Sequence, residues 1–121
     1  MFLRRKKAAT VPVRRVPKRH ECLRFLDLYD SLATSSNVEF PKVIKSQVKK
    51  CNDKLDLRKS ALTDEHVVVL ARVLLELPIF GKINLQNNKI GPRGVAAMLT
   101  VMKDHLNKMV EGHFSMAEVS L

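Results

Sequence analysis

The sequence has few of the residues that build catalytic or metal sites. Its four histidines form no HExxH motif, and no Cys or carboxylate cluster has the spacing of zinc ligands. No GxSxG or GxxxxGK[ST] motif is present. The two cysteines, Cys22 and Cys51, form no CxxC pair, which favours two small buried thiols in a reducing compartment over a redox or metal role. We therefore expect no enzyme, no cofactor and no metal.

Aromatic residues and long apolar runs are also scarce. With no Trp and only one Tyr, any core must be largely aliphatic. No apolar run approaches the roughly 20 residues that span a bilayer, and no apolar segment of a secretory signal follows residues 1–7. The start is Arg-rich like a mitochondrial presequence, but Pro12 and Pro17 interrupt an amphipathic helix there. We expect an intracellular protein, cytoplasmic or cytoskeletal, with the mitochondrion as the alternative.

Acidic residues are missing from the first 20 positions, which hold eight Lys or Arg. The rest of the chain is nearly balanced, with fourteen basic and twelve acidic residues, although the net charge of the whole is +10. Residues 1–19 are thus predicted to be a basic arm that binds RNA, an anionic membrane or an acidic protein surface such as tubulin. A lysine stripe on a later helix is a second candidate contact or simply a solvated face. The predicted contacts are Arg4, Arg5, Lys6, Lys7, Arg14, Arg15, Lys18, Arg19, Lys42, Lys45 and Lys49.

Two helices are predicted to follow the arm and to form a cap over residues 20–51. Apolar residues recur every three or four positions over residues 20–33. Pro41 suits the first turn of a second helix over residues 41–51.

From residue 52 the sequence repeats itself at an offset of 28 residues. Each unit begins with apolar residues at every second position and continues with helical spacing, which predicts a strand, a turn and a helix. The expected strands cover residues 55–57, 83–85 and 119–121, and the expected helices cover 64–76 and 92–108. The paired core positions are Leu55 with Ile83, Leu57 with Leu85, and Leu62 with Ile90.

These residues resemble the leucine-rich repeat family, in its ribonuclease-inhibitor-like class. The family pattern LxLxxNxL stands here as Ile83, Leu85, Asn88 and Ile90, whereas the first repeat departs from it with Ser60 at the Asn position. The resemblance implies an α/β solenoid with an α-helical N-terminal cap, in which residues 52–121 hold two full repeats and the start of a third. At the turn, Asn88 is expected to satisfy backbone groups of neighbouring turns.

The function predicted from these features is a non-enzymatic adaptor or scaffold in a large assembly. The resemblance favours a cytoskeletal or ciliary (axonemal) assembly, with tubulin as the acidic surface. The alternative is a ribonucleoprotein such as a mitochondrial ribosome, with the arm on RNA phosphates. A GTPase regulator is a third, weaker alternative: Ran GTPase-activating proteins share this repeat class, but their charged loops are not found here.

Overall fold

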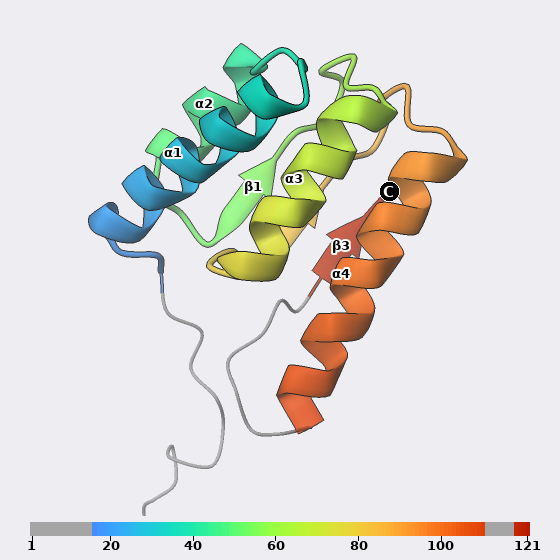
Figure 1. Cartoon of the computed structure of the whole chain (residues 1–121). Helices are drawn as coiled ribbons and strands as arrows, with labels where there is room; N and C mark the ends of the chain where they lie inside the picture. The colour runs from blue at the N-terminus through green and yellow to red at the C-terminus, as the bar shows by residue number, and fades with distance from the viewer. Residues whose placement is uncertain (1–15, 111–117) are drawn as a thin grey trace, which may run out of the picture.

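Helices and short strands alternate in the computed structural model, which describes residues 16–110 and 118–121 (Figure 1). The elements, in chain order, are α1 (Arg19–Ser35), α2 (Lys42–Lys49), β1 (Lys54–Asp56), α3 (Asp64–Glu76), β2 (Lys82–Asn84), α4 (Pro92–Val110) and β3 (Glu118–Ser120). Among the described residues, no helix is long and apolar enough to cross a membrane.

The three strands form one parallel sheet in the order β1-β2-β3. Leu55 pairs with Ile83, so the register of β1 and β2 matches the 28-residue offset seen in the sequence. Helices α3 and α4 lie side by side along this sheet (Figure 1). Helix α1 packs beside α3, while α2 contacts both α1 and β1. The α1–α2 pair therefore lies at the β1 end of the structure.

Local signals set the ends of the helices. Thr63 is the N-cap of α3, where its side chain and that of His66 form a reciprocal capping box. Pro41 is the N-cap of α2 rather than a residue of its first turn. The turns after β1 and β2 share one feature, since Lys59 and Asn87 both have positive φ values, of 51° and 62°. They differ two residues later, because Ala61 has a positive φ of 55° and its counterpart at the 28-residue offset, Lys89, does not.

One largely aliphatic core joins α1, α2, β1, α3, β2 and α4. Five of the six predicted core side chains, Leu55, Leu57, Leu62, Ile83 and Leu85, are at most 1% exposed, and Ile90 is half-buried. Two aromatic residues from distant elements meet in this core, because the Phe25 ring of α1 packs edge-on against Phe80, with centroids 5.2 Å apart. Helix α1 thus belongs to the same core as the strands.

The prediction of a leucine-rich-repeat solenoid with an α-helical N-terminal cap is wrong. The four helices have 17, 8, 13 and 19 residues, whereas each strand has only three, so helix dominates the described residues. The side chains of α1 and α2 also lie in the same buried core as those of β1, α3, β2 and α4. The structure is therefore a small, mainly helical α/β unit.

Candidate functional site

The predicted basic arm lies mostly outside the described residues. Arg4, Arg5, Lys6, Lys7, Arg14 and Arg15 all belong to that part. Its last two cations, Lys18 and Arg19, are exposed at the start of α1. Lys18 is the N-cap residue, and its backbone N–H donates to Glu21 Oε1 at 2.8 Å. Because Pro17 is buried, the chain is fixed to the folded part directly before these two cations.

The three predicted lysines of α2 are all exposed, but they differ in their surroundings. The Lys45 ammonium lies 4.8 Å from the centre of the Phe40 ring, a cation–π arrangement. Lys49, in the last turn of α2, lines a groove together with Arg19. Lys42 and Lys45 do not line it. The structure therefore brings Arg19 and Lys49 together, and this pair is the part of the predicted contact surface that forms a concave site.

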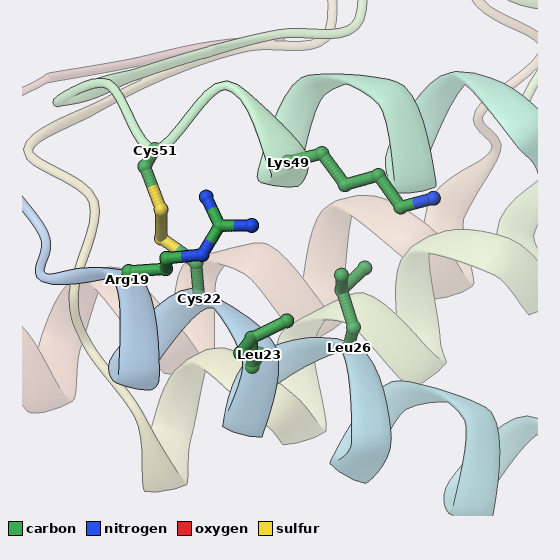
Figure 2. Close-up of a pocket in the computed structure, with 6 residues that line it drawn as sticks. All are labelled: Arg19, Cys22, Leu23, Leu26, Lys49 and Cys51. Carbon is green, nitrogen blue, oxygen red and sulfur yellow. A yellow bond between two sulfur atoms is a disulfide. The ribbon is translucent and has the colours of Figure 1, made fainter.

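This groove has a volume of about 280 Å³ and lies between the start of α1 and the end of α2. Figure 2 shows its six lining residues: Arg19, Cys22, Leu23, Leu26, Lys49 and Cys51. Leu23 is 51% exposed, so the groove offers an apolar surface to solvent. In the view of Figure 2, the disulfide and the Arg19 side chain lie toward one end of the groove, and the Lys49 side chain extends from α2 toward the other end. The groove therefore combines an apolar floor with two cations, which suits a ligand that is both anionic and partly apolar.

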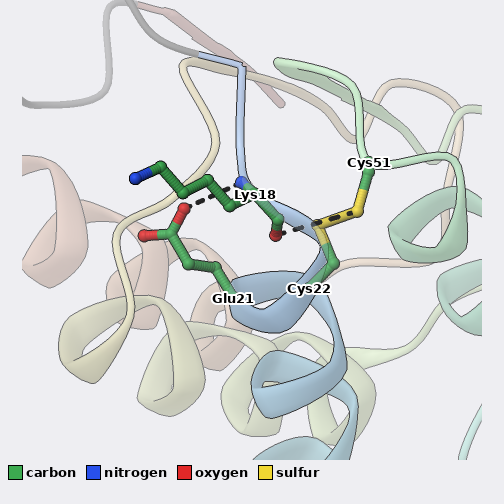
Figure 3. The surroundings of a disulfide bond; sticks show 4 residues. All are labelled: Lys18, Glu21, Cys22 and Cys51. Atoms are coloured by element: carbon green, nitrogen blue, oxygen red, sulfur yellow. Dashed lines mark hydrogen bonds between the residues drawn. A yellow bond between two sulfur atoms is a disulfide. The ribbon is translucent and has the colours of Figure 1, made fainter.

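The prediction of two separate buried thiols is wrong, because Cys22 and Cys51 form a disulfide (Figure 3). Their Cα atoms are 6.0 Å apart, within the usual range. Cys22 is only 2% exposed, whereas Cys51 is half-buried. Cys51 Sγ also lies 3.9 Å from the Lys18 carbonyl oxygen. The pairing depends on α2 folding back along α1, and the spacing of two cysteines in a sequence does not reveal such a contact.

Asn88 bridges the two turns that follow β1 and β2. Its Oδ1 accepts hydrogen bonds from the backbone N–H groups of Ser60 and Leu62, at 2.9 and 3.0 Å. Its Nδ2 donates to the carbonyl oxygens of Leu57 and Leu85, at 2.8 and 2.9 Å. The Ser60 hydroxyl, in contrast, donates within its own turn, to the Arg58 carbonyl oxygen at 3.0 Å. Asn88 thus has the structural role expected for it, whereas the Ser60 side chain does not reach the neighbouring turn.

Among the described residues, Asp56 and Tyr29 have shifted pKa values. Hydrogen bonds from Arg58 lower the pKa of Asp56, at the exposed end of β1. Burial raises the pKa of Tyr29, whose hydroxyl donates to the His66 carbonyl oxygen at 3.0 Å. Within residues 16–110 and 118–121, no three His, Cys, Asp or Glu side chains gather as metal ligands would.

Searches against family models, curated proteins and solved structures found no match to this chain.

Proposed function

We propose that this protein is a non-enzymatic adaptor that docks on an acidic macromolecular surface through its basic N-terminal arm. The observation that carries the proposal is the charge distribution: residues 1–20 hold eight basic residues and no acidic one. Such a segment attracts an anionic partner over about one Debye length and binds it in a salt-dependent way.

The described part of the protein extends this basic surface in a way that favours an acidic protein over RNA. Arg19 continues the arm into the groove, where Lys49 adds a second cation and Leu23 and Leu26 add apolar contacts. Acidic peptides with apolar side chains complement such a groove. Sequence-tolerant binding of single-stranded RNA usually uses exposed aromatic rings for stacking. None of the aromatic residues in the described part, Phe25, Tyr29, Phe40 and Phe80, is fully exposed.

We place the acidic partner in a cytoskeletal assembly, where the acidic tails of tubulin are such peptides. The support for this placement is the charge match between those acidic tails and residues 1–20, which hold eight basic residues and no acidic one. A cytoskeletal partner would place the protein in the cytoplasm.

Cosedimentation with microtubules tests the proposal. The variant lacking residues 1–15 loses six cations but keeps Pro17, Lys18 and Glu21, so α1 retains its N-terminal cap. We expect the full chain to pellet with microtubules and the deletion variant to bind at least about tenfold more weakly, since several charge contacts are lost. Trimming the acidic tubulin tails with subtilisin should weaken the binding of the full chain more than that of the deletion variant, which keeps only Arg19 and Lys49 at the groove.

The alternative partner is distinguished in the same assay. Structured RNA is added in excess at physiological salt, and its binding is also measured directly. Partial competition is expected from any polyanion. If the full chain binds RNA tightly and does not pellet with intact microtubules, the cytoskeletal assignment is wrong and a ribonucleoprotein partner replaces it.

A further inference from the structure

The disulfide lies in the wall of a groove that is open to solvent. Both of its cysteines line that groove, together with two cations and two leucines. A bridge that serves only as a cross-link needs neither an adjacent cavity nor flanking positive charge. A bridge that reacts with small molecules needs both access to one sulfur atom and a stabilised leaving thiolate. The surroundings of Cys22 and Cys51 meet these two requirements.

Access is unequal at the two sulfur-bearing residues. Cys51 is half-buried and follows α2 in a turn, whereas Cys22 is 2% exposed. An incoming thiolate therefore reaches the sulfur of Cys51 before that of Cys22. The volume of the groove, about 280 Å³, lies just below the range of typical ligand pockets, so it is large enough for a small thiol compound.

The charge around the bridge favours both the leaving group and an anionic reagent. Cys22 is the fourth residue of α1, so its sulfur lies near the positive end of the helix dipole. Arg19 and Lys49 add two full positive charges at the groove. Glu21 is the one acidic residue in the first turn of α1, and its carboxylate accepts a hydrogen bond from the Lys18 backbone instead of lining the groove.

We propose that the Cys22–Cys51 bridge is a site of reversible S-thiolation by small anionic thiols, which the groove binds between Arg19 and Lys49. The thiolate of the small molecule attacks Cys51 Sγ, and a new sulfur–sulfur bond forms there. The bond to Cys22 Sγ breaks, and its electron pair leaves on Cys22 as a thiolate. A second small thiolate attacks the sulfur of the bound small molecule, which releases the small-molecule disulfide and leaves Cys51 as a thiolate. The protein bridge is thus reduced by two electrons while two small thiols are oxidised.

The test compares the rates at which two thiols open the bridge in the full-length protein. Glutathione carries a net negative charge and 2-mercaptoethanol carries none on its non-thiol part. Samples are quenched with acid at intervals, and free thiols are counted by maleimide labelling and intact-mass spectrometry. The measured quantity is the ratio of the two rates. Because the intrinsic reactivity of each reagent is the same for every variant, changes in this ratio report only the charge selectivity of the protein.

Removing the two groove cations should lower this selectivity. We expect the double variant Arg19→Gln, Lys49→Gln to have a rate ratio about three- to tenfold below that of the wild type, the effect of two screened charges near the reacting sulfur atoms. The matched control, Lys42→Gln with Lys45→Gln, removes the same charge from exposed positions of α2 that do not line the groove. Its ratio should equal that of the wild type. Circular dichroism checks that all forms are folded.

The site of modification is established separately. The variant Cys22→Ser leaves Cys51 without a resolving partner, so glutathione disulfide should convert it to a stable mixed disulfide at Cys51. In the reverse variant, Cys51→Ser, the buried Cys22 should react at least about tenfold more slowly, because burial limits access to its thiol.

Two results would overturn the proposal. One is a rate ratio that falls equally in the groove variant and in the control variant, or in neither of them. The other is faster modification of Cys22 than of Cys51. The first measurement uses the intact bridge, so it remains decisive if a single-cysteine variant fails to fold.

Discussion

Asn88 is the residue through which two neighbouring turns share hydrogen bonds, and replacing it with Ala isolates that role. The substitution removes one acceptor and one donor group that together make four bonds of 2.8–3.0 Å. Two backbone N–H groups and two backbone carbonyl groups lose this partner at once. All four bonds are partly buried, so water replaces them only in part.

The expected loss follows from these four bonds. A neutral hydrogen bond contributes about 0.5–1.5 kcal/mol net, so we expect Asn88→Ala to lower the free energy of unfolding by about 2–4 kcal/mol. For a protein of this size, that loss corresponds to a fall of roughly 8–15 °C in the thermal midpoint. Asn88→Asp should not restore stability, because a carboxylate oxygen would face the carbonyl oxygens of Leu57 and Leu85, to which the amide nitrogen now donates.

Thermal and urea unfolding, followed by circular dichroism, measure these losses. Gln86→Ala is the matched control, since Gln86 is an exposed residue of the same turn. The reasoning is refuted if Asn88→Ala shifts the midpoint no more than Gln86→Ala does. It also fails if Asn88→Asp is as stable as the wild type, because the two donated bonds would then contribute nothing.

Three further substitutions have expected outcomes. A Cβ at Gly94 would lie 2.6 Å from Ile90 Cγ2 and 2.8 Å from Asp64 Oδ1. Gly94→Ala should therefore lower the free energy of unfolding by about 1–3 kcal/mol. A denaturant titration that shows a higher free energy of unfolding, as at an unhindered helical glycine, would contradict this. Burial raises the pKa of Tyr29 above its ordinary value of 10.0. The unfolded chain therefore loses this proton first, and the wild type should lose stability as the pH rises above 10.0. In urea titrations at alkaline pH, Tyr29→Phe should show a weaker dependence of the free energy of unfolding on pH, and the same pH dependence in both proteins would count against this. Cys51→Ser removes a bridge between residues 29 positions apart. It should lower the free energy of unfolding by about 3–4 kcal/mol in denaturant titrations. Equal stabilities of the bridged wild type and the variant would show that the bridge restricts the unfolded chain little.

The sequence was sufficient for the elements that depend on local patterns. The alternation at Leu55 and Leu57 and the helical spacing after Thr63 identified β1 and α3 to within one residue, because the period of burial differs between strand and helix. The bonding role of Asn88 followed from the family pattern. The overall architecture did not follow, since that pattern describes a unit and says nothing of how many units share a core with α1.

The site was less accessible to prediction than the strands and helices. The lysines of α2 were identified as one stripe, yet only Lys49 joins Arg19 at the groove. Which cation faces which depends on the crossing of α1 and α2, and that crossing involves contacts between segments, such as Tyr29 of α1 stacked on Phe40 before α2. The same crossing determines that Cys22 meets Cys51. Helical periodicity predicts which face of each helix is buried, but it does not predict which other element packs against that face.

The position of the disulfide has a mechanical consequence for a protein held by its N-terminal end. Tension along that end enters the fold at the buried Pro17 and reaches Cys22 within the first turn of α1. With the bridge closed, the load passes directly to Cys51, three residues before β1, and both helices between them are shielded from it. With the bridge open, these 29 positions can be pulled out to about 100 Å of extended chain. The oxidation state of one bond thus sets whether the tether is a short, stiff link or a long, extensible one.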